Sequence, residues 1–214
     1  MQNFSKYENG WFSEICPMWP GASLSIEIQE VLYSAKSECQ QIELYQTSRH
    51  GKMLVLDGII QLTESDEFAY HEMLAHVPLF AHPDPKKVLV VGGGDGGVLR
   101  EICRHDCIKR VDFCEIDDKV IEVSRKFLPD LSCGFDDPRV RIYIEDGNQF
   151  VARKNDTYDV IIIDSSDPIG PGEALFKKEF YESLKKALLP GGVIASQGES
   201  YFMHKKEVIN LVKI

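Results

Sequence analysis

The chain has 214 residues, of which 43% are hydrophobic and 27% are charged, and its formal net charge is −10. These values exclude a disordered chain, and the length allows one or two domains whose core needs no disulfide. The acidic balance argues against a nucleic-acid-binding protein, which would need basic patches, and is compatible with a cationic ligand. Residues 1–10 contain no apolar signal segment, and no apolar run approaches the ~18 residues of a membrane span. We therefore expect a soluble, cytoplasmic protein.

The cysteine pattern points to the same compartment. No two cysteines form a C-x-x-C motif, and the one close pair, at positions 103 and 107, has helical spacing without a histidine arrangement suited to zinc. We expect all six to be reduced thiols, as is usual in a cytosolic protein. They are Cys16, Cys39, Cys103, Cys107, Cys114 and Cys133.

The N-terminal part has the two-residue period of β-strands. From Ser23 to Glu64 apolar and polar residues alternate, which predicts an antiparallel sheet. Within it the runs Lys52–Leu56 and Ile59–Leu62 flank Asp57-Gly58. This dipeptide supplies the positive φ angles of a two-residue turn, so we predict a β-hairpin here.

A helix and a change in composition follow. The pattern predicts a helix over Glu67–Ala81, which Pro78 ends or kinks, and a connecting segment over His82–Lys86. We place a domain boundary near residue 80. An N-terminal β domain with its linking helix then occupies residues 1–80, and a catalytic domain occupies residues 81–214.

Beyond that boundary strands and helices alternate. We predict strands over Val88–Val91, Val111–Ile116, Val140–Ile144, Val160–Ile163 and Val193–Ser196, and helices over Val98–Arg104, Asp118–Phe127, Asn148–Arg153 and Lys177–Leu188. Apolar strands separated by helices indicate a parallel sheet that is covered on both faces. The predicted fold class is therefore α/β, a Rossmann-like (methyltransferase-type) doubly wound sheet preceded by a small N-terminal antiparallel β domain. In such sheets ligands bind beyond the carboxyl ends of the strands, where the strand order reverses.

The first of these strands is followed by a glycine-rich loop, Gly92-Gly-Gly-Asp-Gly-Gly97. It satisfies both G-x-G-x-x-G and the G-x-G-x-G loop of methyltransferase-like folds, and its glycines let the backbone approach a nucleotide-like ligand. Asp95 within the loop would repel a pyrophosphate but attract an ammonium or sulfonium group. The position of Asp95 therefore disfavours NAD or FAD as the ligand, because both contain a pyrophosphate. Alternatively Asp95 caps the next helix, and the two roles are compatible.

Further carboxylates follow the second and third strands. Glu115 lies 21 positions after Gly94, where an acidic side chain accepts hydrogen bonds from ribose hydroxyls. We assign no ribose contact to Asp117 or Asp118, because one of these two residues is expected to start the next helix. Asp146 can accept a hydrogen bond from an exocyclic amine such as that of adenine, or it can serve only as a turn or helix cap.

The fourth strand is followed by Asp164 and Asp167 in a loop rich in proline and glycine, which could fold over a ligand. Four or five carboxylates without basic partners suit a cationic nucleoside. We predict no metal, because no histidine accompanies the carboxylates at ligand spacing.

Six segments together closely resemble the spermidine synthases of the polyamine aminopropyltransferase family, and the resemblance extends over nearly the whole chain. They are Trp11–Glu14, Trp19–Gly21, Val55–Gln61, Asp66–Met73, Gly92–Glu101 and Asp164–Pro168. The family transfers the aminopropyl group of decarboxylated S-adenosylmethionine to putrescine and releases methylthioadenosine. The donor is thus a co-substrate, and the resemblance implies no cofactor.

The resemblance also implies two sets of site residues. The donor set is Gln40, His71, Asp95, Glu115, Asp146 and Gly147, and the putrescine set is Glu14, Trp19, Gln61, Tyr70, Asp164, Asp167 and Glu199. Asp164 is the expected base. A homo-oligomer, namely a dimer, is expected of the full-length protein. Family members continue for several strands beyond the position of Ile214, so we expect a C-terminally truncated chain that is a poor enzyme by itself.

Alternative functions remain open. A putrescine N-methyltransferase uses intact S-adenosylmethionine, whose carboxylate Asp95 would repel. Spermine synthase lacks the Asp-Ser-Ser-Asp-Pro pattern that begins at Asp164. A catalytically impaired fragment that only binds its ligand or oligomerises is a further alternative, and a dinucleotide oxidoreductase is disfavoured by Asp95 and its acidic companions.

Overall fold

The computed structural model describes residues 5–16, 19–165, 174–198, 200–202 and 204–213. It comprises two compact units, Met1–Tyr70 and His71–Ile214. The division lies earlier in the chain than the boundary that we placed near residue 80.

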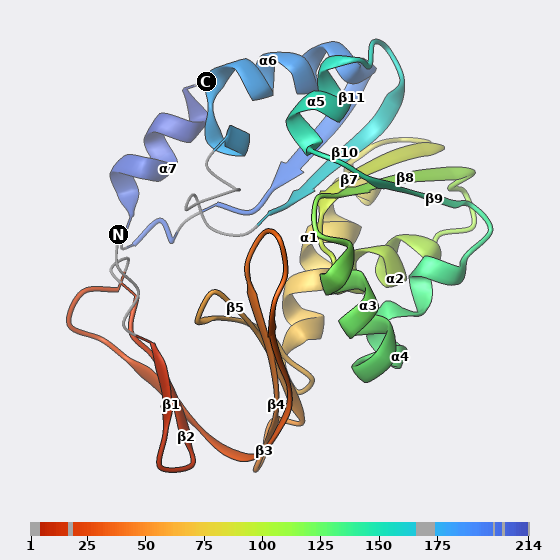
Figure 1. The fold of residues 1–214 in the computed structure, drawn as a ribbon. Coiled ribbons are helices and arrows are strands. Elements are labelled where there is room, and N and C mark those ends of the chain that lie inside the picture. Colours follow the sequence, from red (N-terminus) through yellow and green to blue (C-terminus); the bar gives the residue numbers. More distant parts are fainter. Residues whose placement is uncertain (1–4, 17–18, 166–173, 199, 203, 214) are drawn as a thin grey trace. The chain divides into compact units, whose positions relative to one another are not determined.

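The first unit contains a six-stranded antiparallel sheet whose strands are neighbours in chain order (Figure 1). Its strands are β1 (Lys6–Glu8), β2 (Trp11–Glu14), β3 (Leu24–Lys36), β4 (Gln41–Thr47), β5 (Lys52–Leu56) and β6 (Ile59–Thr63). The predicted antiparallel sheet is confirmed, and β1 and β2 extend it on the N-terminal side.

Two tight turns organise this sheet. Asp57 and Gly58 connect β5 to β6 with φ angles of 48° and 78°, so the predicted hairpin is confirmed. Asn9 and Gly10 connect β1 to β2 in the same way, with φ angles of 51° and 79°. Both dipeptides adopt the left-handed conformation that two-residue hairpin turns require.

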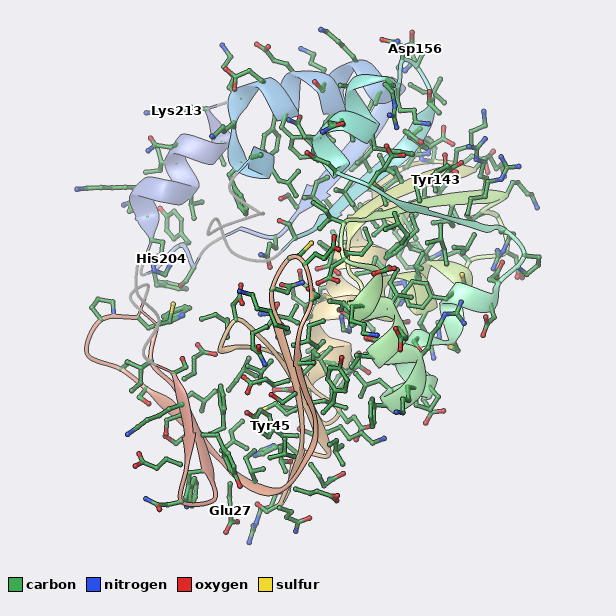
Figure 2. The ribbon with its side chains drawn as sticks, viewed as in Figure 1. Glu27, Tyr45, Tyr143, Asp156, His204 and Lys213 are labelled. Carbon is green, nitrogen blue, oxygen red and sulfur yellow. The ribbon has the colours of Figure 1, made fainter. Side chains whose placement is uncertain are left out.

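The core of the first unit is built from side chains on both faces of the central strands of its sheet. Tyr45 of β4, which Figure 2 labels, is 1% exposed and contacts Phe12 of β2, with 5.4 Å between the ring centroids. Met53 and Val55 of β5 are fully buried in the same cluster. Leu54 between them is buried too, so β5 does not show the alternation of buried and exposed residues that a strand with one solvent-facing side would have.

The second unit contains a five-stranded parallel sheet with the order β11-β10-β7-β8-β9. These strands are β7 (Lys87–Gly92), β8 (Arg110–Glu115), β9 (Val140–Ile144), β10 (Tyr158–Asp164) and β11 (Leu188–Ser196). The first strand of the sheet, β7, lies between β8 and β10, so the chain reverses its direction of winding there. The predicted doubly wound sheet is confirmed, with its switch point beside the glycine-rich loop.

Helices cover both faces of this sheet (Figure 1). The helical elements of the chain are α1 (Glu67–Ala81), α2 (Gly97–Cys103), α3 (Asp118–Phe127), α4 (Pro129–Ser132), the 3₁₀ helix η1 (Cys133–Asp136), α5 (Gly147–Ala152), α6 (Lys178–Ala187) and α7 (Lys205–Val212). Buried side chains of α1, α2 and α3 form one cluster with the sheet, and those of α5 and α6 form a second cluster on its other face.

Several bounds differ from the predicted ones. Helix α1 has the predicted bounds, Glu67–Ala81, and continues through the buried Pro78, so the proline does not end it. Strand β11 begins at Leu188, earlier than the predicted Val193, directly after α6. The short elements α4 and η1 were not predicted.

No disulfide joins any of the six cysteines, all of which lie in the part of the chain that the structure describes. Among the residues that the structure describes, no helix is long and apolar enough to cross a membrane.

Candidate active site

The glycine-rich loop lies directly against the end of β10. Gly92 has a φ of 82°, and a Cβ atom there would lie 2.1 Å from the carbonyl oxygen of Asp164. A Cβ atom on Gly93, where φ is 75°, would lie 2.7 Å from Oδ2 of Asp164. Both positions therefore need glycine for two reasons, the left-handed backbone and the close approach. The loop and the predicted base are neighbours because of these glycines.

Asp95 holds the start of α2 and pairs with a histidine at the same time. Its Oδ1 accepts a hydrogen bond of 2.7 Å from the Gly97 N–H and lies 3.2 Å from Nε2 of His71. Burial is the largest influence and acts to raise the pKa of Asp95, but the hydrogen bond and charge of His71 and the backbone N–H groups together outweigh it and keep the pKa below its usual value. The N-cap of α2 is Gly96, so Asp95 bonds to the first residue of the helix from the position before the cap, and its side chain remains 15% exposed.

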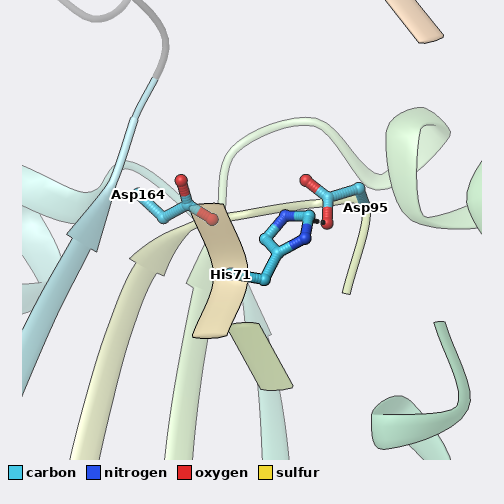
Figure 3. Close-up of side chains that lie close together, drawn as sticks. All are labelled: His71, Asp95 and Asp164. Atoms are coloured by element: carbon cyan, nitrogen blue, oxygen red, sulfur yellow. Dashed lines mark ion pairs between the residues drawn. The ribbon is translucent and has the colours of Figure 1, made fainter. Parts of the chain in front are cut away.

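His71 is the histidine that sequence spacing could not place beside the carboxylates. It is 2% exposed, and its ring packs so closely on Gly97 that a Cβ atom there would lie 2.4 Å from the imidazole. Figure 3 shows the ring between Asp95 and Asp164, and each of the three residues offers an atom within 4.8 Å of the others. Our premise that no histidine accompanies the carboxylates was therefore wrong, because His71 comes from α1, which precedes the sheet.

These three residues could geometrically hold a metal ion. Nε2 of His71 lies 3.2 Å from an Asp95 oxygen that already accepts the Gly97 N–H, so an ion here could use only the Nδ1 lone pair of His71 together with carboxylate oxygens. We keep the prediction that an organic cation occupies this place.

Glu115 ends β8 and is 8% exposed. Its Oε1 accepts hydrogen bonds of 2.7 Å and 3.0 Å from the N–H groups of Ile116 and Asp117. Burial nevertheless dominates and, with the charges of Asp117 and Asp164, raises the pKa of Glu115 to about 7. A Cβ atom on Gly94 would lie 3.1 Å from Oε2, so the glycine-rich loop passes this carboxyl too. Of the two residues predicted to start the next helix, Asp117 caps α3 by accepting from the Lys119 N–H, and Asp118 is the first residue of the helix.

Asp146 caps α5, as the structural alternative for this residue predicts. Its Oδ1 accepts a hydrogen bond of 2.8 Å from the Asn148 N–H, and Gln149 Nε2 lies 3.4 Å from Oδ2. The next residue, Gly147, leaves room for a neighbouring strand, since a Cβ atom there would lie 2.4 Å from Cγ1 of Val91. The donor-binding role of both residues stays a prediction.

Most of the predicted putrescine set and one donor residue belong to the first unit, which we describe by itself. Glu14 accepts a hydrogen bond of 2.7 Å from the Ile60 N–H, and Gln61 Nε2 donates to the Ile59 carbonyl oxygen. Tyr70 on α1 is 40% exposed.

The other residues of these sets take part in local turns or lie outside the described residues. The Gln40 N–H donates to the hydroxyl of Ser37, and Trp19 takes part in a turn with backbone hydrogen bonds to residues 16 and 22. Asp167 and Glu199 lie outside the described residues. The roles of these residues stay predictions.

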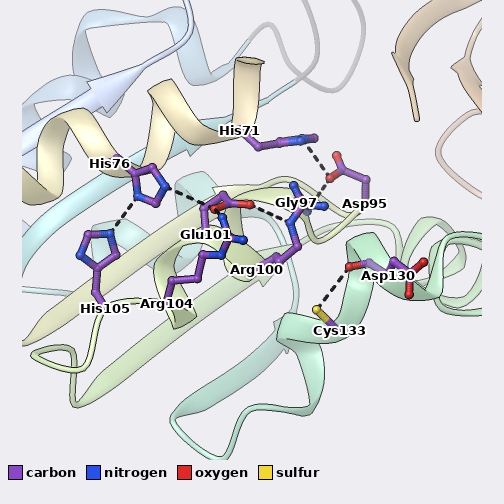
Figure 4. Close-up of polar contacts among 10 residues, drawn as sticks. All are labelled: His71, His76, Asp95, Gly97, Arg100, Glu101, Arg104, His105, Asp130 and Cys133. Carbon is purple, nitrogen blue, oxygen red and sulfur yellow. Dashed lines mark hydrogen bonds and ion pairs between the residues drawn. The ribbon is translucent and has the colours of Figure 1, made fainter. Parts of the chain in front are cut away.

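Sequence reasoning missed a buried polar network next to α2. Glu101 is 1% exposed and accepts hydrogen bonds of 2.7 Å from Arg100 and from Arg104 (Figure 4). Burial acts to raise its pKa, but the two arginines outweigh burial and hold the pKa below its usual value. Nε2 of His76 lies 3.3 Å from Oε2 of the same carboxylate, and the other ring nitrogen of His76 contacts His105. The signal in the sequence was an acidic residue inside an otherwise apolar helix with basic residues at i−1 and i+3.

The second unit thus has a glycine-rich loop at a topological switch point and carboxylates at the ends of β8 and β10. This combination is typical of a Rossmann-like domain, in which ligands bind beyond the carboxyl ends of the strands at the switch point. The family model described as the spermine/spermidine synthase domain matches residues 67–214, and the spermidine synthase tetramerisation domain matches residues 10–64. The chain belongs to the spermine/spermidine synthase family.

Individual relatives agree with this assignment. The chain is 55% identical to spermidine synthase of Coffea arabica over 95% of its own length and 65% of the relative's, and 55% identical to that of Dictyostelium discoideum over 93% and 70%. The chain therefore spans about two thirds of the length of these relatives. A solved spermidine synthase in complex with the transition-state analogue AdoDATO has a TM-score of 0.90 and 42% identity, covering 97% of this chain and 73% of that one. Spermidine synthase from Thermotoga maritima has a TM-score of 0.89 and 43% identity over 95% and 68%.

Proposed function

We propose that the protein is a spermidine synthase, which transfers the aminopropyl group of decarboxylated S-adenosylmethionine to putrescine. The observation that carries this proposal is the carboxylate of Asp95 inside the glycine-rich loop, with Asp164 on the other side of His71. Asp95 would bind the free ammonium group of the donor. Two relatives that are 55% identical to this chain are named spermidine synthase, which supports the same activity.

The donor's nucleoside would lie along the ends of β7, β8 and β9. Glu115 would accept hydrogen bonds from the two ribose hydroxyls, and Asp146 would accept one from the exocyclic amine of adenine through Oδ2, the oxygen that does not accept the Asn148 N–H. Gly147 would let the adenine approach the backbone. No resident cofactor takes part, because the reacting group arrives on the donor.

The chemical step is a substitution at carbon. The neutral amine nitrogen of putrescine attacks the aminopropyl carbon next to the sulfonium, the C–S bond breaks, and its electron pair stays on sulfur in methylthioadenosine. The new nitrogen centre loses one proton, which Asp164 accepts. An amine with a lysine-like pKa of about 10.4 is neutral in only about one molecule in 2,500 at pH 7, a deficit of roughly 4.6 kcal/mol. A positioned carboxylate offsets part of this deficit. Orientation of the two substrates lowers the barrier of the substitution itself.

The acceptor and the assembly follow from the family rather than from the described geometry. We propose that Glu14, Trp19, Gln61, Tyr70, Asp167 and Glu199 line the putrescine channel together with Asp164, and that Gln40 contacts the donor. The tetramerisation domain matched by residues 10–64 supports a homo-oligomer, of which the expected dimer would be one half. We also propose that the protein acts in the cytoplasm, which agrees with the absence of disulfides among its six cysteines.

The proposed activity is tested by turnover of decarboxylated S-adenosylmethionine with putrescine, measured as spermidine formed. Asp164→Asn should lower kcat by about 10²- to 10⁴-fold because the amide cannot take the proton, while methylthioadenosine binding changes little. Asp156→Asn, at an exposed position, is the matched control and should keep the wild-type rate. Because the 214-residue chain is expected to be a poor enzyme by itself, both rates are measured in the full-length protein. Full-length wild-type protein that forms no spermidine would contradict the proposed activity, and full-length Asp164→Asn protein with more than about a tenth of the wild-type kcat would exclude Asp164 as the base.

A further inference from the structure

A pair of histidines outside the proposed active site brings two imidazole nitrogens within hydrogen-bond distance of each other. His76 of α1 and His105, which follows α2, place Nδ1 and Nε2 at a distance of 2.9 Å (Figure 4). Their ring centroids are 5.0 Å apart, and the ring planes meet at 51°. The side chain of His76 is 22% exposed and the neighbouring Phe80 is 77% exposed, so the pair lies at the surface.

Glu101 fixes the orientation of His76. Its Oε2 lies 3.3 Å from His76 Nε2, and the carboxylate is itself held by the guanidinium groups of Arg100 and Arg104. A carboxylate only accepts hydrogen bonds, so His76 carries its proton on Nε2 and turns the lone pair of Nδ1 toward His105. Metal-binding histidines are oriented by a carboxylate in the same way.

We propose that His76 Nδ1 and His105 Nε2 form a binding site for a divalent late first-row transition metal ion, a role beyond the proposed transferase activity. Two adjacent ligands at bond lengths of about 2.0–2.1 Å from one ion are about 3 Å apart, close to the observed separation of the two nitrogens. To bind the ion, each ring turns so that its lone pair points at a common centre. His105 moves its proton from Nε2 to Nδ1, and water fills the remaining coordination positions.

The site would connect two elements on one face of the parallel sheet. His76 belongs to the same helix as His71, and His105 lies between α2 and β8. An ion that binds the folded protein and not the separated segments stabilises the folded state by mass action. Bound metal should therefore raise the thermal unfolding midpoint and hold α1 against the segment that follows α2.

Titration calorimetry with Ni²⁺ tests this site, because imidazole suits that ion. The protein is used without a histidine tag, reduced and freed of metal by a chelator that is then removed. We expect one saturable site, and we expect His76→Gln and His105→Gln each to weaken it by at least about tenfold. His82→Gln, which alters a histidine beyond the end of α1, is the matched control and should bind Ni²⁺ as the wild type does.

Two further measurements separate this site from the alternatives. His71→Gln should keep the wild-type affinity for Ni²⁺. If only this variant loses Ni²⁺ binding, the metal binds at His71, Asp95 and Asp164, and the proposal is overturned. Ni²⁺ should raise the unfolding midpoint of the wild type but not of His105→Gln, a replacement that leaves the contact between His76 and Glu101 in place. Absence of saturable binding, or binding that survives both His76→Gln and His105→Gln, would also overturn the proposal.

Discussion

Replacing Glu115 with glutamine is expected to stabilise the unliganded protein above neutral pH while weakening its binding of the donor. Glu115 is 8% exposed, and its pKa is raised from the usual 4.5 to about 7. Burial is the main cause of this shift. Glutamine keeps the shape and an oxygen that can accept from the Ile116 and Asp117 N–H groups, but it carries no charge to desolvate.

The size and pH dependence of the effect follow from the two pKa values. Between about pH 4.5 and pH 7 the folded protein keeps a proton on Glu115 that the unfolded chain has released, so wild-type stability falls as the pH rises through this window. At about 1.4 kcal/mol per pH unit, the full penalty is about 3 kcal/mol and is reached above pH 7. Glu115→Gln removes that penalty. The variant should be more stable by about 3 kcal/mol at pH 9 and by less than about 1 kcal/mol at pH 5.

Urea unfolding at pH 5 and pH 9 measures this difference directly. Glu122→Gln on α3, where the side chain is 67% exposed, is the control and should show no gain that depends on pH. Methylthioadenosine should bind Glu115→Gln roughly tenfold more weakly, because a neutral acceptor replaces a charged one at the ribose hydroxyls. A stability difference between Glu115→Gln and wild type that is equal at both pH values, or has the opposite sign, would refute the argument.

Two further predictions concern how the second unit is held together. Gly92→Ala should destabilise the protein by several kcal/mol, because the new Cβ atom would meet a carbonyl oxygen at 2.1 Å, whereas Gly191→Ala has a similar positive φ with nothing within 4 Å and should cost only about 1 kcal/mol. Equal unfolding free energies for the two variants would show that the close approach is not limiting. Asp112→Ala should cost about 3–5 kcal/mol in urea unfolding, because it leaves Arg110 without its bidentate partner and Tyr158 without its hydrogen-bond acceptor in a buried place; a loss below about 1 kcal/mol would contradict this.

The regular parts of the fold were predictable because their signals are local. Apolar runs separated by helical periods identified the five parallel strands, and Asp57-Gly58 identified a hairpin. The same reasoning applied to Asn9-Gly10 would have found β1 and β2, whose turn has the same positive φ angles. Those strands are so short that their own residues show little alternation, so the turn was the only strong signal.

The site was predictable to the extent that strand ends determine it. Glu115 and Asp164 follow from their positions at the ends of parallel strands, and the structure brings both to the glycine-rich loop. His71 could not be found by spacing, because it precedes the sheet and reaches Asp95 only through the packing of α1 on the loop. Its role came from the family resemblance. The contact of His76 with Glu101 likewise joins two separate helices and has no local signature.

The central claim is that Asp95 and its neighbours form a site for a cationic nucleoside. The selectivity of this site for the donor tests the claim most directly. The measurement is the dissociation constant of the wild-type protein for decarboxylated and for intact S-adenosylmethionine, determined under identical conditions, and repeated with Asp95→Asn. We expect the decarboxylated donor to bind at least about tenfold more tightly to the wild type, and we expect this preference to shrink in Asp95→Asn because a charge-assisted hydrogen bond worth about 1.5–3 kcal/mol is lost. Equal affinity of the wild type for the two donors, or a preference that Asp95→Asn retains in full, would contradict the account.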